Sequence, residues 1–193
     1  MNWSPLDPMT LVTEAWIVLM LYWAFSALRV KQMKYIAPAS VRFVQLIFLV
    51  PGCILLFKER SRVGMLHMQV LPSAPAIIWI GVGIAWLGIA FAIWARYVLG
   101  GNWSSAVAIR EGHELIRSGP YRVIRHPIYT GIIIGGWGTA VVAGQLGAFI
   151  GVILITLGFA YKGNQEELRL HATFGDAWLA HRRRTGMFLP KLR

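Results

Sequence analysis

The chain has little charge of negative sign and almost no cysteine. Only 14% of its 193 residues are charged, with 8 Asp and Glu against 19 Lys and Arg. The single cysteine, Cys53, excludes an internal disulfide, and we expect it to pack within the protein. No paired His or Cys spacing resembles a metal ligand set, and no glycine-rich phosphate loop is present. The sequence therefore predicts neither a metal centre nor a nucleotide-binding loop of that kind.

What the chain has is long apolar runs, which make it 56% hydrophobic. A membrane-spanning helix needs about 20 apolar residues, so the longest run, of 34 residues, suits two short helices with a turn near Ala143–Gly147. The second run is interrupted by Pro51 and Gly52. The sequence predicts an all-α polytopic membrane protein, one integral domain over 1–193, with about five transmembrane helices. The runs are Leu11–Leu28, Phe43–Phe57, Ala74–Ala95 and Ile128–Tyr161.

The basic residues predict an orientation in the membrane. The first ten residues hold no Lys or Arg, which is unlike a signal peptide. Five spans place residues 29–42, 96–127 and 162–193 on one side, with 16 of the 19 Lys and Arg. By the positive-inside rule this side is the cytoplasm, and the N-terminus lies outside. Because the basic residues are spread over loops that face a leaflet, we expect them to attract anionic lipids and not a nucleic acid.

Two segments between and after the spans have their own character. Residues 100–124 are mixed polar and aromatic, and we expect them to form an ordered interfacial connector. Residues 164–184 show helical spacing of apolar side chains, which predicts an amphipathic helix that continues the fifth span and bends along the cytoplasmic surface. Arg182–Arg184 are expected to be solvated and to face lipid headgroups.

The stretch RHPIYTG, residues 125–131, places charge at the mouth of the longest apolar run. Pro127 suits the first turn of a helix, with His126 at the cap. The free N–H groups of that helix start and Arg125 would then meet an anionic group together. The fifth helix returns to the same side with Glu166 and Glu167, so the hairpin predicts a cluster at one membrane face. Alternatively, Arg125 only reaches toward the interface and a glutamate neutralises it.

Small residues recur along the predicted fourth span. Gly131 and Gly135 form a GxxxG pattern, and Gly138 extends the small-residue face. Such a stripe favours close helix packing, and it also leaves room for a ligand. Both interpretations stay open from the sequence.

The stretches HELIRSGPYRVIRHPIYTG and EELRLHATFGDAW resemble the isoprenylcysteine carboxyl methyltransferase family. The resemblance covers residues 102–190, about half of the chain, and is typical of a prokaryotic member. It implies that residues 100–193, with the connector, the last hairpin and the C-terminal helix, form the catalytic core behind three transmembrane helices in residues 1–99. It also implies that S-adenosylmethionine binds at the cytoplasmic face. Its cofactor-binding residues would be His113, Leu115, Gly119, Tyr121, His126, Pro127, Tyr129, Gly131, Glu166 and Glu167.

The resemblance further implies catalytic roles for Arg125 and Glu167, with Arg125 between the cofactor and the methyl acceptor. The expected acceptor is a carboxylate of an isoprenoid-like or lipid-linked substrate that enters from the bilayer, because a planar guanidinium matches a carboxylate. Three alternatives stay open. They are a phospholipid N-methyltransferase, an NADPH-dependent oxidoreductase of the sterol-reductase type, and a lipid-binding protein without activity.

Overall fold

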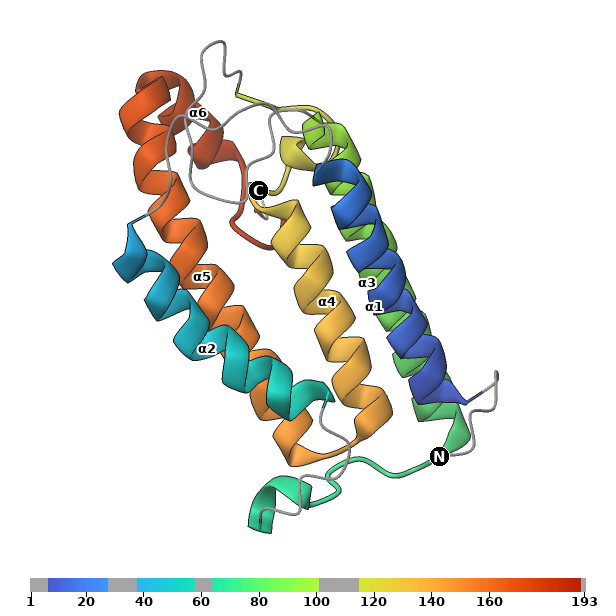
Figure 1. The fold of residues 1–193 in the computed structure, drawn as a ribbon. Helices are drawn as coiled ribbons and strands as arrows, with labels where there is room; N and C mark the ends of the chain where they lie inside the picture. The colour runs from blue at the N-terminus through green and yellow to red at the C-terminus, as the bar shows by residue number, and fades with distance from the viewer. Residues whose placement is uncertain (1–6, 28–37, 58–63, 101–114, 192–193) are drawn as a thin grey trace.

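The structure, a computed structural model, describes residues 7–27, 38–57, 64–100 and 115–191. The described chain consists of helices joined by short segments (Figure 1). The predicted all-α fold is therefore confirmed. The helices are α1 (Pro8–Ala27), α2 (Ala39–Phe57), α3 (Pro75–Leu99), α4 (Pro127–Ala143), α5 (Leu146–Phe174) and α6 (Asp176–Arg184), with 3₁₀ turns η1 (Gly64–His67) and η3 (Gly119–Arg122).

Four helices, α1, α2, α3 and α5, are long and apolar enough to cross a membrane, and α4 is a shorter apolar helix. The five lie side by side and alternate in direction along the chain (Figure 1). The chain reverses between α4 and α5 at Gly144, whose φ of 67° is left-handed and suits glycine. The long apolar run therefore forms a hairpin with its turn at the predicted place.

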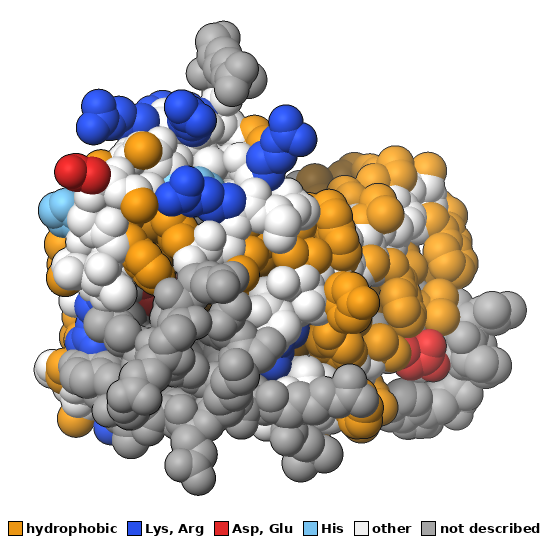
Figure 2. All heavy atoms as spheres, turned by 90° about the horizontal axis from the view of Figure 1, so that it is seen from above, with side chains coloured by type: hydrophobic (Ala, Val, Ile, Leu, Met, Phe, Trp, Pro, Cys, Tyr) orange, Lys and Arg blue, Asp and Glu red, His pale blue; other side chains and the backbone are white. Residues whose placement is uncertain are grey.

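The outer surface of the bundle is apolar along the helices and basic at one end. Leu21, Phe43 and Leu87 are between 65% and 71% exposed, as suits side chains that face lipid. Seen end-on from the side of α6, Lys and Arg side chains gather over one part of the end face, while hydrophobic side chains cover another flank (Figure 2). This distribution is that of a polytopic membrane protein.

Helix α2 corrects two expectations drawn from the sequence. It runs through Pro51 without a break, because its other backbone groups still bond within the helix. Gly52 lies against α5, where a Cβ would come within 2.9 Å of the carbonyl oxygen of Gly151. Cys53 is exposed on the helix surface, so the expectation that it packs within the protein is wrong.

Glycines bring α3 and α4 into close contact, which confirms the packing role of the small-residue stripe. A Cβ at Gly131 would lie 2.5 Å from the backbone nitrogen of Ala92 and 2.6 Å from the carbonyl oxygen of Gly88. A Cβ at Gly138 would lie 2.7 Å from the carbonyl oxygen of Gly81. Since the obstacles are backbone atoms, larger side chains would force the two helices apart.

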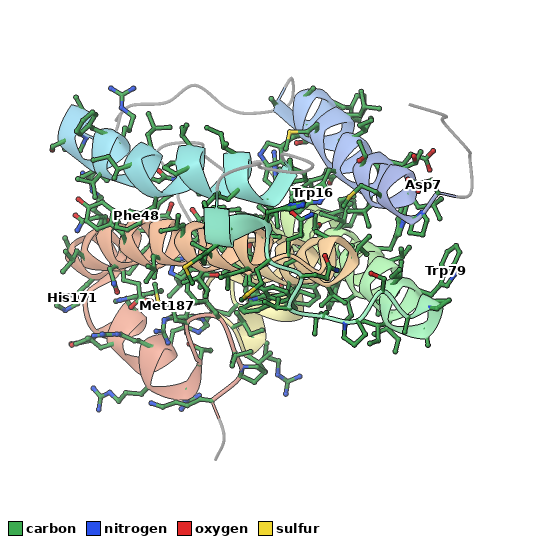
Figure 3. All side chains as sticks on the ribbon, turned by 90° about the horizontal axis from the view of Figure 1, so that it is seen from below. Asp7, Trp16, Phe48, Trp79, His171 and Met187 are labelled. Carbon is green, nitrogen blue, oxygen red and sulfur yellow. The ribbon has the colours of Figure 1, made fainter. Side chains whose placement is uncertain are left out.

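Tryptophan side chains link the helices and mark their outer edge. The indole nitrogen of Trp16 in α1 donates a hydrogen bond to the Thr139 hydroxyl of α4 at 3.0 Å, and its ring meets Phe57 of α2 edge-on. Viewed from the end opposite to α6, Trp16 lies among the helices, whereas Trp79 lies at the margin and is 49% exposed (Figure 3). The Trp16 side chain therefore joins three helices, through one polar contact and one aromatic contact.

The C-terminal amphipathic helix is interrupted. Helix α5 continues to Phe174, and Gly175, with a φ of 51°, separates it from α6. The bend is confirmed, but the single helix predicted over residues 164–184 is in fact two. Trp178 of α6 is buried at 2% exposure, whereas Leu168 of α5 is 65% exposed.

Candidate active site

The start of α4 has the predicted geometry. Pro127 occupies the first turn of α4. His126 is the N-cap, and its backbone, with a φ of −122° and a ψ of 59°, is not helical. The C-terminal segment then covers this start. The backbone N–H of Arg125 donates to the carbonyl of Gly186 at 2.9 Å, and that of His126 donates to Met187 at 3.1 Å. A distant segment of the chain thus occupies two backbone donors just before the helix, and the binding of an anion at the helix start stays a prediction.

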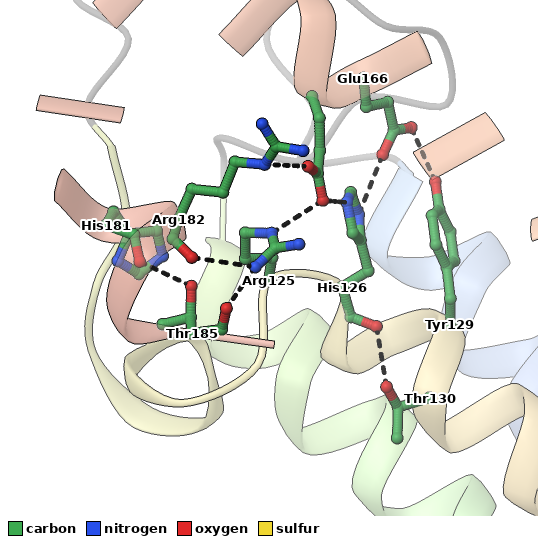
Figure 4. Close-up of polar contacts among 9 residues, drawn as sticks. Arg125, His126, Tyr129, Thr130, Glu166, His181, Arg182 and Thr185 are labelled. Carbon is green, nitrogen blue, oxygen red and sulfur yellow. Dashed lines mark hydrogen bonds and ion pairs between the residues drawn. The ribbon is translucent and has the colours of Figure 1, made fainter. Parts of the chain in front are cut away.

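Glu167 of α5 is the meeting point of three positively charged or titratable groups (Figure 4). Its Oε1 lies 2.7 Å from Nε of Arg125 and 3.4 Å from Nε2 of His126. Its Oε2 lies 3.2 Å from Nε of Arg182 in α6. Glu167 is 7% exposed, so these partners replace the water that its charge has lost.

Glu166, the neighbouring residue on α5, has a separate set of partners. The hydroxyl of Tyr129 donates to Oε1 at 2.7 Å, and Lys162 lies 3.9 Å from the same oxygen. Nδ1 of His126 lies 3.4 Å from Oε2. The two carboxylates therefore approach the imidazole from its two nitrogens, as the predicted hairpin requires.

His126 is held between these carboxylates and against an aromatic ring. Its ring stacks on Tyr129 with a centroid distance of 5.4 Å and an interplanar angle of 5°. Burial lowers the pKa of His126, but the hydrogen bonds and charges of Glu166 and Glu167 outweigh it, so the pKa is raised from its ordinary value. Within the described residues, Nε2 has no partner with hydrogen-bond geometry. The imidazole thus favours its charged form between two anions.

Arg125 is fixed by both α5 and the C-terminal segment. Besides the Glu167 contact, its Nη1 donates a short hydrogen bond to the carbonyl of Thr185 and a longer one, at 3.4 Å, to the carbonyl of Arg182. The side chain is 9% exposed. A glutamate neutralises Arg125 here, as one of the two sequence interpretations required, and its role toward an acceptor stays a prediction.

The remaining predicted site residues lie at different distances from this cluster. Tyr121 is buried in η3, where burial and then the charge of Glu166 raise the pKa of its hydroxyl. Leu115 is half-buried, and Gly119, with a φ of 54°, lies against Val98 of α3. Their part in binding a cofactor stays a prediction.

Two further predicted residues belong to the helix scaffold, and one cannot be placed. Pro127 is fully buried under the C-terminal segment, and Gly131 faces α3. His113 lies outside the described residues. Contacts with the cofactor stay a prediction for all three.

Other residues of the site were not found from the sequence. Gly163 lies four residues before Glu167, and a Cβ there would come within 3.3 Å of Nε2 of His126 and 2.5 Å of the Met187 side chain. The hydroxyl of Thr130 donates to the carbonyl of Phe188 at 2.8 Å. The four-residue spacing could have indicated Gly163. No local pattern signals the return of the C-terminal segment.

The described part of the cluster suits a cationic ligand better than a metal. No group of three His, Cys, Asp or Glu side chains within residues 7–27, 38–57, 64–100 and 115–191 is placed to hold a metal ion. The carboxylates of Glu167, which is buried, and of Glu166, which is half-buried, can instead receive an ammonium group or hydroxyls. An apolar groove of about 460 Å³ on α1 and α3, lined by Tyr22, Trp86 and Tyr97 among others, contains none of the predicted site residues.

Known proteins resemble parts of this chain. Methanethiol S-methyltransferase 2 of Bradyrhizobium diazoefficiens is 34% identical over 59% of the chain. The methanethiol S-methyltransferase of Mycobacterium tuberculosis is 25% identical over 81%. The protein-S-isoprenylcysteine O-methyltransferase of Schizosaccharomyces pombe is 31% identical over 47%. The matched parts span 47%, 66% and 40% of these three proteins, respectively.

The model of the isoprenylcysteine carboxyl methyltransferase family matches residues 80–172. This range runs from α3 to the last turn of α5 and contains Arg125, His126 and both glutamates of the cluster. The family match and the cluster thus coincide at one end of the hairpin. Over these residues, just under half of its length, the chain is similar to the isoprenylcysteine carboxyl methyltransferase family.

Proposed function

We propose that the protein is a membrane methyltransferase that transfers a methyl group from S-adenosylmethionine to an anionic, lipophilic acceptor at the cytoplasmic face. The observation that carries this proposal is the pair of glutamates on α5, Glu167 buried and Glu166 half-buried, that meet Arg125 and His126 at the start of α4. The cluster lies within the family match, and relatives of the chain are named methyltransferases.

The carboxylates of the cluster suit the cationic and hydroxyl groups of this cofactor. When bound, S-adenosylmethionine supplies an electrophilic methyl group on a sulfonium. Glu166 and Glu167 would receive its ammonium group or ribose hydroxyls through charge-assisted hydrogen bonds. Each carboxylate is at present balanced by cations of the chain, so binding exchanges one cation for another. The protein's part is to align the reactants and to exclude water.

An acceptor that is already anionic fits the described residues best. Both glutamates are engaged by Arg125, His126, Lys162 or Arg182, so neither stands free to remove a proton. A carboxylate would need no such base, because it is already ionised, and the bound cofactor would supply the methyl group and a neutral thioether as the leaving group. Arg125, whose Nε and Nη1 are held, would orient the carboxylate with its remaining N–H groups.

A thiol is the second candidate acceptor, because relatives of the chain are named methanethiol S-methyltransferases. A thiol must lose its proton to become a strong nucleophile. Incubating the protein with labelled S-adenosylmethionine separates the two candidates. Label recovered in a lipid ester from a membrane extract supports the carboxylate acceptor, whereas label recovered as a volatile thioether from added methanethiol supports the thiol.

Cofactor binding tests the proposal directly. In calorimetry, the purified protein should bind S-adenosylmethionine and not NADPH. Glu167→Gln should weaken binding by about 1–3 kcal/mol, because a charge-assisted hydrogen bond is lost. Glu14→Gln is the matched control, since Glu14 is exposed on α1 far from the cluster in sequence. Binding of NADPH alone would favour the oxidoreductase, and binding of neither ligand would favour a protein without activity.

A further inference from the structure

Arg125 also lines a pocket of about 430 Å³ between the start of α4, helix α6 and the C-terminal segment. Three other basic residues line the same pocket, and they come from α6 and the chain end: Arg182, Arg183 and Lys191. Nζ of Lys191 donates to the backbone carbonyl of Arg183 at 3.3 Å, which ties the chain end to α6. Four cations from three segments thus converge on one hollow.

These cations outnumber the carboxylates that meet them. In the described part of the chain, the ion pairs of the four go to Glu167, which receives Arg125 and Arg182. The positive charge also affects His181 of α6. Burial and then the charges of Arg117 and Arg125 lower the pKa of its imidazole. Like charges held this close repel one another unless an anion lies between them. The pocket is therefore built to receive negative charge.

The surroundings of the pocket indicate an amphiphile. Leu179 is part of its wall, and the chain end beside it carries Leu189, which is 72% exposed. On the end face of the bundle, Lys and Arg side chains gather next to a flank of hydrophobic side chains (Figure 2). Basic groups beside exposed apolar side chains at the edge of a membrane-spanning bundle match the phosphate and upper acyl region of a lipid.

We propose that this pocket binds the phosphate group of an anionic phospholipid, and that the bound lipid draws Arg182 away from Glu167. The Arg182 side chain is 58% exposed, so it can turn toward a phosphate at little cost. Its departure frees Oε2 of Glu167 for the cationic cofactor. This coupling rests on the proposed function, whereas the lipid site itself does not. By linkage, lipid and cofactor would strengthen each other's binding.

Lipid retention tests the site independently of activity. Native mass spectrometry of the purified full chain should show retained phosphatidylglycerol in preference to phosphatidylcholine. Arg183→Gln and Lys191→Gln should each lower this preference about fivefold, the ratio expected for one cation near a membrane surface. Arg184→Gln is the matched control, because Arg184 is the exposed neighbour on α6 and does not line the pocket.

Three outcomes would contradict the lipid site. An equal loss in the Arg184→Gln variant would show a general surface effect, and unchanged retention in both pocket variants would show that the pocket is not used. If millimolar inorganic phosphate displaces phosphatidylglycerol and supports cofactor binding equally well, the site takes a free anion and the lipid assignment is wrong.

Cofactor affinity tests the coupling. In nanodiscs, wild-type protein should bind S-adenosylmethionine several-fold more tightly with phosphatidylglycerol than with phosphatidylcholine alone. Arg182→Gln should bind tightly in both lipids, while Arg184→Gln should behave as wild type. A lipid effect of equal size in all three proteins overturns the coupling. Absence of cofactor binding in every lipid counts against the proposed function instead. The lipid site is then tested by the retention of phosphatidylglycerol alone.

Discussion

At the scale of single residues, the site depends on how Arg125 is shared. Its guanidinium contacts a carboxylate of α5 and carbonyls of the C-terminal segment at once, which only a planar group with several N–H donors can do. Arg125 therefore joins the proposed cofactor site to the basic pocket between α4, α6 and the C-terminal segment. A substitution that keeps the positive charge but removes the planar guanidinium would separate the alignment of an acceptor from its electrostatic attraction.

Arg125→Lys should lower methyl transfer tenfold or more while cofactor affinity stays near the wild-type value. A tenfold loss corresponds to about 1.4 kcal/mol of transition-state stabilisation. Turnover and cofactor binding should be measured on the same preparation. Arg122→Lys, an exchange at an exposed residue of η3, is the control. Full turnover with lysine at position 125 would reduce Arg125 to an interfacial anchor.

His126 should make the stability of the protein without cofactor depend on pH. A histidine whose folded pKa is raised contributes stability that is complete below its unfolded pKa, about 6.5. That contribution is lost as the pH rises through the folded value. The thermal unfolding temperature should therefore fall as the pH rises above about 6.5.

The His126→Asn variant isolates this effect. Asn keeps a polar side chain at the helix cap but does not titrate. The difference in unfolding temperature between wild type and variant should shrink as the pH rises through the raised pKa. His181, whose pKa is lowered, contributes equally to both proteins and cancels in the difference. A difference that stays constant across this range would contradict a charged imidazole between Glu166 and Glu167.

At the scale of helices, α3 and α4 can pack as closely as they do because glycines lie at their contact. Gly131→Ala should destabilise the protein by about 1–3 kcal/mol, because the added methyl meets the backbone of Gly88 and Ala92. Gly83→Ala on α3 is the control, since a Cβ there meets nothing within 4 Å. Unfolding in detergent compares the two variants. Equal stabilities would contradict the close crossing.

At the scale of the whole molecule, the arrangement of helices predicts a sidedness. The segment before α3 lies at one end of the bundle, and α6 lies at the other end (Figure 1). The last turn of α6 carries Arg182, Arg183 and Arg184. Reporter fusions after Ser73 and after Arg193 should therefore report opposite sides of the membrane, with Arg193 in the cytoplasm. Reports from the same side would remove the hairpin that brings Glu166 and Glu167 to Arg125.

The sequence alone determined the all-α membrane class, the hairpin of α4 and α5, and the meeting of charged residues at the end of that hairpin. Apolar run length must match the thickness of a bilayer, so the hairpin of α4 and α5 follows from counting residues. Proline at a helix start and glycine at a left-handed turn are local requirements, so Pro127 and Gly144 marked the two ends of α4. Because the hairpin returns the chain to one face, the meeting of Arg125 and His126 with the two glutamates was also predictable.

Tertiary structure alone decided what surrounds that centre. The C-terminal segment covers the start of α4 through hydrogen bonds between residues about sixty positions apart, and such contacts leave no periodic pattern. The exposure of Cys53 depends on which face of α2 meets α5, which composition does not fix because every face of a membrane helix is apolar. The basic pocket likewise forms only because the chain turns at Gly175 and brings α6 to Arg125. The sequence names the basic residues, but only the packed chain decides where α6 lies.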